Sequence, residues 1–206
     1  TIQILAQAFA AWTAPICTGA GADAGKQSAS IVPLFGGLTT DGTVGYVSPR
    51  STPSNKNLIR YRDDAWLHTD SSNTLGLTTL TYDVDTGEVY DADMEINSHD
   101  HVLYSGDAAH VPTDGYDLRT ILTHEVGHFL GLAHSGDRDA TMFASYKPGS
   151  TTQSTLTSDD AAGLCEAYRP SGERSVLGGT LKPASACAAG ATSGCDGSMS
   201  GGCSLE

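Results

Sequence analysis

HEVGHFLGLAH, at residues 124–134, is the stretch of sequence that decides how this chain folds. His124 and His128 are four residues apart, so on a helix they lie on one face, one turn from each other. Gly131 lacks a Cβ and can take a positive φ, which ends a helix in a sharp turn. His134 then returns toward the same point. The spacing predicts a helix, a turn and three imidazoles around one metal ion.

The residue types around that ion indicate its chemistry. Three neutral imidazoles leave a fourth coordination position open, as in catalytic zinc sites, and zinc lowers the pKa of bound water to roughly 7. Glu125 follows the first histidine and is placed for an attacking water rather than for ligation. We therefore expect one catalytic zinc, with Glu125 as the general base that takes the water proton and then, as general acid, protonates the leaving amine.

The long pattern H-E-x-x-H-x-x-G-x-x-H, followed by Met142, resembles that of the metzincin peptidases. Within them the segment is most similar to the matrixins, the family of the matrix metalloproteases, because Ser135 follows the third histidine. Residues 140–146 resemble the matrixin Met-turn, with Phe143 in place of its first tyrosine and Tyr146 as its second aromatic residue. The resemblance implies that Met142 supports the zinc site without ligating it. It also implies that Tyr146 walls the pocket for the residue after the scissile bond.

Residues 156–164 resemble the last helix of the same family. Thr157 or Ser158 is placed to cap this helix, because both side chains can accept a hydrogen bond from its first turn. The resemblance implies that Asp159 and Asp160 tie the helix to the Met-turn or to a chain terminus. Simple matching of two acids to the positive end of the helix dipole is an equal alternative.

The fold class that the resemblance implies is α+β, with the metzincin arrangement of a twisted mixed sheet, three main helices, the zinc-bearing helix and the Met-turn. Apolar residues at steps of three and four predict a first helix over Ile2–Trp12. Four segments are strand candidates: Ala29–Phe35, Asn57–Arg62, Leu75–Tyr82 and Glu88–Ile96. By resemblance Leu75–Tyr82 is the edge strand above the site. An extended substrate could add to it as a further strand, although a plain edge strand is the alternative.

The composition changes near residue 171. Residues 1–170 are predicted to form a matrixin-like catalytic domain, and residues 171–206, rich in Gly, Ala and Ser, a C-terminal linker or stalk. Gly-Gly-Cys at 201–203 resembles the cysteine of a myxobacterial C-terminal sorting tail, which implies a secreted protein tethered at the cell surface. A matrixin domain opens with a strand before its first helix, whereas Thr1 stands almost at the helix. We expect a missing N-terminal piece or another segment in that place.

The five cysteines include no C-x-x-C pair, so a cysteine-based zinc site is not predicted. Cys17 ends the first helical pattern and Cys165 lies in the last. We expect a disulfide between them, which an oxidising compartment permits, and two buried free thiols are the alternative. Cys187 and Cys195 could close a local loop in the tail, which leaves Cys203 over.

Charge and hydropathy restrict the partners. The formal net charge of −13, from 24 acidic against 11 basic residues, argues against nucleic acid and anionic membranes. No apolar run reaches membrane-spanning length, so no membrane insertion is expected. The predicted partner is a protein or peptide substrate, bound by a monomer.

Two polar clusters are candidates for a second metal, although ordinary loop residues are the favoured interpretation of both. A structural zinc could take its ligands from a histidine-rich cluster: His99, Asp100, His101 and His110. A loose calcium site could use Asp83 and Asp85.

The predicted function is that of a secreted zinc-dependent endopeptidase. Two alternatives stay open, because the motif encodes the activation of water rather than the bond that is cleaved. One is a zinc-stabilised binding or adhesion module without hydrolytic activity. The other is a zinc hydrolase that acts on non-peptide amides.

Overall fold

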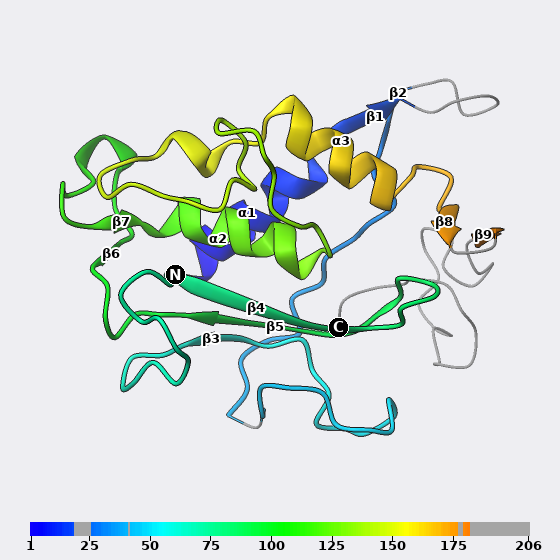
Figure 1. The fold of residues 1–206 in the computed structure, drawn as a ribbon, viewed down its shortest axis with the longest axis horizontal. Coiled ribbons are helices and arrows are strands. Elements are labelled where there is room, and N and C mark those ends of the chain that lie inside the picture. The colour runs from blue at the N-terminus through cyan, green and yellow to red at the C-terminus, as the bar shows by residue number, and fades with distance from the viewer. Residues whose placement is uncertain (19–25, 41, 177–178, 182–206) are drawn as a thin grey trace.

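The computed structural model describes residues 1–18, 26–40, 42–176 and 179–181. In these parts of the chain, three α-helices lie on one side of a small mixed sheet (Figure 1). They are α1 (Ile2–Thr13), α2 (Leu118–Phe129) and α3 (Ser158–Ala167). The expected α+β class is therefore confirmed, and α2, which carries the first two histidines, is the helix that faces the sheet.

The sheet has the order β3-β5-β4. Strand β3 (Ile59–Tyr61) runs parallel to β5 (Val89–Ile96), and β4 (Gly76–Tyr82) runs antiparallel to β5. A tight turn joins β4 to β5, where Gly87 has a φ of 70°, a value that favours glycine. Three of the four expected strands are thus present, and β4 forms the edge of the sheet beside α2.

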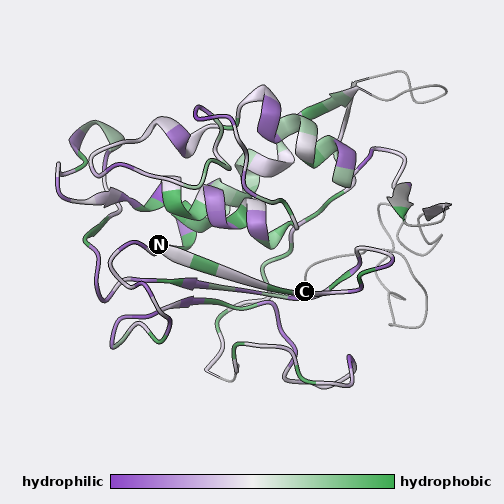
Figure 2. Cartoon of the chain, in the orientation of Figure 1, coloured by the Kyte–Doolittle hydropathy of each residue, from purple (hydrophilic) through white to green (hydrophobic). Residues whose placement is uncertain are grey.

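The two faces of β5 have opposite character because strand residues alternate between faces. Ala92, Met94 and Ile96 point into the apolar core and are fully buried. The opposite face carries three acids that are also buried: Asp91, Asp93 and Glu95. Figure 2 shows the hydrophilic colouring along this strand.

Asp93 and Glu95 on the outer face of β5 hold the segments before and after β3. Asp93 accepts hydrogen bonds from the backbone N–H groups of Gly45 at 2.5 Å and Leu58 at 2.9 Å. Glu95 pairs with Arg62 and lies 2.8 Å from the His68 ring. A buried carboxylate is tolerated only when it has hydrogen-bond or ionic partners. These contacts therefore fix the segments around β3 to the outer face of the sheet.

The apolar core lies between α1, α2 and the sheet. Its largest fully buried side chain is Trp12 at the end of α1, whose indole N–H donates to the Thr123 carbonyl in α2 at 2.7 Å. Gly127 makes this approach possible: a Cβ there would lie 2.2 Å from the sulfur of Met142 and 2.7 Å from the Trp12 ring. The motif glycine therefore sets the distance between α1, α2 and the segment that follows the histidines.

The expected strand over Ala29–Phe35 is wrong, because these residues form no strand. Pro33 lacks the N–H that a ladder needs, and the Ser30 N–H donates to the Tyr168 carbonyl at the end of α3. Strands form instead just before this segment. There β1 (Ile16–Thr18) pairs antiparallel with β2 (Lys26–Ser28).

Short elements complete the described chain. Strands β6 (Leu103–Tyr104) and β7 (Tyr116–Asp117) pair in parallel just before α2. Strands β8 (Arg174–Val176) and β9 (Gly179–Leu181) form a hairpin of their own after α3. The described residues also include the 3-10 turns η2 (Ala108–His110) and η3 (Thr152–Ser154).

A disulfide joins Cys17 in β1 to Cys165 in α3, the pairing expected from the sequence. It links segments separated by 148 residues. The three other cysteines lie outside the described residues, as does most of the predicted linker from residue 182 onward. Among the described helices, none is long and apolar enough to cross a membrane.

Candidate metal centre

Helix α2 begins and ends at defined signals. Asp117 caps its N-terminus by accepting from the Thr120 backbone N–H at 2.9 Å. At its C-terminus Gly131 has a φ of 87°, and its N–H donates to the His128 carbonyl at 2.7 Å. The chain therefore turns back sharply after α2, which is what brings His134 beneath the helix face that carries the other two histidines.

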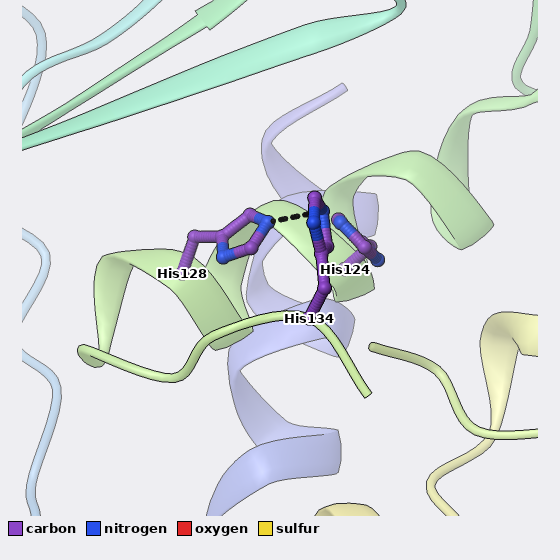
Figure 3. A group of neighbouring side chains, drawn as sticks. All are labelled: His124, His128 and His134. Atoms are coloured by element: carbon purple, nitrogen blue, oxygen red, sulfur yellow. Dashed lines mark hydrogen bonds between the residues drawn. The ribbon is translucent and has the colours of Figure 1, made fainter. Parts of the chain in front are cut away.

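The three histidines meet at one point, as Figure 3 shows, with two rings from α2 and one from the loop after it. One ligand nitrogen from each of His124, His128 and His134 lies within 4.8 Å of the others, and Nε2 of His128 is 3.1 Å from Nε2 of His134. The spacing of the His128–His134 pair is close to the roughly 3.3 Å expected between two nitrogens that each lie about 2.0–2.1 Å from a tetrahedral zinc.

The second nitrogen of each helix histidine has its own partner. Nδ1 of His124 lies 2.7 Å from the Thr141 carbonyl, and Nδ1 of His128 lies 2.8 Å from the Leu132 carbonyl. A carbonyl oxygen can only accept, so each Nδ1 carries the proton and each Nε2 lone pair is available to a metal. The donor set therefore fits a zinc ion.

Burial favours the neutral form of the two helix histidines, because it lowers the pKa of each. Burial lowers the pKa of His124 to about 3, and neighbouring His128 and His134 act in the same direction. The pKa of His128 is also lowered, mainly by burial. Neutral imidazole is the form that binds a metal, so the protein environment favours the metal-binding state near neutral pH.

Glu125 lies against the sheet edge beside the histidines. It is 5% exposed, and its Oε2 accepts from the Thr78 hydroxyl at 2.7 Å. Burial raises the pKa of Glu125 to about 7, while the hydrogen bond from Thr78 acts in the opposite direction. Gly76 lies directly beneath the carboxyl group, because a Cβ at Gly76 would be 2.8 Å from its Oε1.

The segment after His134 closes the floor of the site. Met142 is 2% exposed, and the Ser135 N–H donates to its carbonyl at 2.8 Å. Asp160 in α3 accepts from the backbone N–H groups of Thr141 at 2.8 Å and Met142 at 2.9 Å. Asp159 instead accepts from the Ser135 hydroxyl at 2.6 Å. Both acids of α3 therefore contact the segment that carries the third histidine and the methionine.

A pocket of about 330 Å³ opens over the histidines. Tyr146 lines it with its ring edge-on to His124, at 5.2 Å between centroids. The Tyr146 hydroxyl is buried and has no hydrogen-bond partner among the described residues. The pocket is lined by β4 and the loop before it, the site residues and the Met142 segment: Asn73, Thr74, Leu75, Gly76, Leu77, Thr78, His124, Glu125, His128, His134, Ala144 and Tyr146.

Comparison with known proteins identifies the family. The family model for the matrixin peptidases matches residues 34–169, which is well over half of the chain. The chain belongs to the matrixin family. That match covers β3, β4, β5, α2 and α3, and so includes the complete candidate metal centre.

Individual relatives match this matrixin over shorter segments. Metalloendoproteinase 1-MMP of Arabidopsis thaliana is 46% identical over 54 residues, which are 26% of this chain and 15% of that protein. Metalloendoproteinase 1 of Glycine max is 35% identical over 79 residues, or 38% of this chain and 26% of that protein. Human matrix metalloproteinase-20 is 43% identical over 58 residues, or 28% of this chain and 12% of that protein. The aligned part therefore spans about a quarter or less of these relatives.

The candidate residues for a second metal in this matrixin do not come together. Among the described residues, only the three histidines at the pocket form a group of three potential ligands. The histidine-rich cluster is divided among separate partners: His99 contacts Asp100, His101 contacts the Ser71 carbonyl, and His110 contacts Asp107. Asp83 holds the turn between β4 and β5 by accepting from the Thr86 N–H and hydroxyl.

Two site residues of this matrixin were not found from the sequence, Gly76 and Thr78. Both lie on β4 two residues apart, so they are on the same face of the strand, the face that packs against α2. Because side chains alternate between the two faces of a strand, the predicted strand already puts these two residues on one face. The sequence near them does not show that this face contacts Glu125. The contact joins positions 47 residues apart in the chain.

Proposed function

We propose that this chain is a zinc-dependent endopeptidase that hydrolyses peptide bonds of protein or peptide substrates. The observation that carries the proposal is the meeting of three imidazoles with a buried acidic side chain, Glu125, in the lining of one open pocket. His124, His128 and His134 would hold one zinc ion through their Nε2 atoms. Met142, which is buried and packs against Gly127 of α2, is proposed as support beneath them and not as a ligand.

Zinc bound there would activate a water molecule and polarise the carbonyl of the scissile bond. Glu125 accepts the proton of the attacking water and later donates it to the leaving amine. Its position on α2, next to His124 and hydrogen-bonded to Thr78 of β4, supports a role as base rather than as a ligand. His124 and His128 donate their Nδ1 protons to backbone carbonyls and so hold their ring orientation.

The substrate is proposed to bind in an extended form along residues 75–77, at the start of β4. This part of the sheet edge lines the pocket, and its main-chain groups can pair with an added strand. Tyr146, on the opposite wall, is proposed to face the side chain that follows the scissile bond. Main-chain pairing of this kind selects peptides over other amides, because only a peptide repeats the N–H and C=O groups that the edge offers.

We propose that the protein acts outside the cell as a monomer, with residues 1–170 as the catalytic domain and residues 171–206 as a linker. The disulfide between Cys17 and Cys165 supports an oxidising compartment. A tether through the tail is proposed from sequence only, since those residues lie outside the described part of the chain.

The test is cleavage of a proteome-derived peptide library by the purified, zinc-loaded chain, beside Glu125→Gln. Glu166→Gln, the same change at an exposed position of α3, is the matched control. We expect Glu125→Gln to lower kcat/KM by about 10²- to 10⁴-fold with one zinc still bound, and Glu166→Gln to match the parent. If parent and variants all hold zinc and none cuts peptides, the proposal is wrong. A binding module or a hydrolase of other amides then takes its place.

A further inference from the structure

Thr78 makes an unusual pair of contacts with Glu125. Its hydroxyl lies 2.7 Å from Oε2 of the carboxylate and 3.3 Å from the backbone carbonyl of the same residue. A hydroxyl has one proton, and the shorter contact to the charged oxygen takes it. Thr78 therefore donates to one named oxygen of the proposed general base, from a strand rather than from the helix that carries it.

The same strand limits where the carboxylate can lie. Gly76 precedes Thr78 by two residues and faces α2 with it, and Oε1 of Glu125 packs where a Cβ of Gly76 would be. The carboxylate thus packs against Gly76 on one side and accepts a hydrogen bond from the Thr78 hydroxyl on the other. Among the described residues no hydrogen-bond donor contacts Oε1, so this oxygen remains the one available to a proton from outside the protein.

We propose that Thr78 is a positioning residue for Glu125, whose hydroxyl fixes Oε2 so that Oε1 receives the proton of the attacking water. The inference rests on the proposed function and deepens it, because it assigns separate roles to the two oxygens of one carboxylate. Thr78 then acts only through Glu125, without bonding to substrate or metal.

The physical reason is the freedom of a glutamate side chain. It has three rotatable bonds, and holding it in one rotamer costs conformational entropy that a hydrogen bond to its charged form offsets. Without the Thr78 donor, Oε2 would be a nearly buried charge with no partner, and the side chain would turn toward solvent to regain one. The general base would then spend part of its time displaced, and small displacements of a reacting group lower the rate steeply.

Three variants of the zinc-loaded full chain test this role. Thr78→Val keeps the shape but removes the donor, and Thr78→Ser keeps the donor. Thr79→Val makes the same chemical change at the next residue of β4, whose side chain is exposed and points to the other face. Should Thr78→Val not fold, Thr78→Ala removes the hydroxyl in the same way. Steady-state kinetics on one good peptide substrate, with zinc counted in each protein, give kcat and KM separately.

We expect Thr78→Val to lower kcat about 10- to 100-fold while KM stays within about twofold and one zinc remains bound. Thr78→Ser should recover kcat to within about threefold of the parent, and Thr79→Val should match the parent. The proposal is overturned if Thr78→Val keeps the parent kcat, if its loss lies wholly in KM, or if Thr78→Ser is as slow as Thr78→Val.

A crystal structure of the zinc-loaded parent and of Thr78→Val provides a measurement without turnover. The expected difference is a Glu125 carboxylate that lies on β4 in the parent and leaves it, or occupies two positions, in Thr78→Val. An unchanged carboxylate in Thr78→Val overturns the positioning role. A parent that cuts no peptide, yet shows the expected difference in the crystal, contradicts the proposed function and leaves the role of Thr78 supported.

Discussion

Asp160 in the first turn of α3 accepts a hydrogen bond from the backbone N–H of Met142 at 2.9 Å. Its other oxygen accepts from the Thr141 N–H and from Thr157, the residue that caps the helix. One carboxylate, 2% exposed, therefore fastens the helix start to the floor of the metal centre. Because the Thr141 carbonyl in turn orients the His124 ring, the helix and a zinc ligand share one chain of hydrogen bonds.

Asp160→Asn should therefore weaken both the fold and the metal site. Asparagine has a single acceptor oxygen, so its amide N–H₂ must face at least one backbone N–H that Asp160 now satisfies. We expect the free energy of unfolding to fall by about 2–4 kcal/mol and zinc affinity to fall about tenfold. Urea denaturation and zinc titration measure the two effects.

The neighbouring acid provides the control for that substitution. Among the described residues, Asp159 accepts only from the Ser135 hydroxyl, in a contact at the surface, so Asp159→Asn should change stability by less than about 1 kcal/mol. Equal losses in the two variants would show that the charge at the helix start matters and that the contact with Met142 does not.

Gly127→Ala should destabilise the protein although alanine favours helices. The added Cβ would meet the Met142 sulfur at 2.2 Å and the Trp12 ring at 2.7 Å, so α1 and the Met142 segment must move away from α2. We expect a loss of about 1–3 kcal/mol by urea denaturation. Gly163→Ala in α3 is the opposite case, because its nearest neighbour, Leu132, would be 3.6 Å away. There we expect a gain of about 0.5–1 kcal/mol. A stable Gly127→Ala protein would contradict the packing argument.

The parts of the site that follow from local geometry could be predicted from the sequence. Residues four apart on a helix share a face whatever surrounds them, and a glycine three residues before His134 allows the turn that the structure contains. The same holds for Thr157 as helix cap, whose capping box with Asp160 needs only residues of one turn.

The parts of the site that depend on contacts between distant residues could not be predicted from the sequence. Thr78 reaches Glu125 only because β4 is the edge strand and crosses α2 at that residue, which no periodic pattern states. The strand predicted over residues 29–35 is absent because of a distant contact. The apolar, β-branched composition of this segment suits a strand, but Pro33 and the hydrogen bond from Ser30 to Tyr168 prevent one. Strand propensity shows only that the side chains of a segment would fit in a sheet. Whether the segment forms a strand depends on the residues that pack beside it.

The disulfide between Cys17 and Cys165 should contribute strongly to stability. It restricts a loop of 148 residues in the unfolded chain, which the chain-entropy model values at about 5 kcal/mol. We expect the double variant Cys17→Ala/Cys165→Ala to lose about 3–5 kcal/mol in urea denaturation under oxidising conditions. Each single variant should lose about as much as the double one, since either change breaks the bond. A single variant as stable as the parent would show that the bridge does not form in solution.

Asp91 predicts a pH dependence of stability that is independent of the metal centre. Burial, together with the adjacent charge of Asp93, raises the pKa of Asp91 to about 6 from an ordinary value of 3.8. The folded protein thus holds this proton more tightly than the unfolded chain does. The associated stability is fully present below about pH 4 and is lost as the pH rises through about 6.

Asp91→Asn should remove that loss, because asparagine stays neutral and can still donate to Asp93. We expect the variant to be more stable than the parent at pH 7.5, by about 1–2 kcal/mol after allowing for solvent screening, and equal to it near pH 4. Asp85→Asn, an exposed position in the turn between β4 and β5, should leave the curve of stability against pH unchanged. Urea denaturation of all three proteins between pH 4 and pH 8 measures the difference. If the free energies of unfolding of the parent and of Asp91→Asn differ by a constant amount from pH 4 to pH 8, then Asp91 is already ionised at pH 4. In that case the backbone N–H groups of Gly45 and Leu58 hold Asp93 without help from a proton on Asp91.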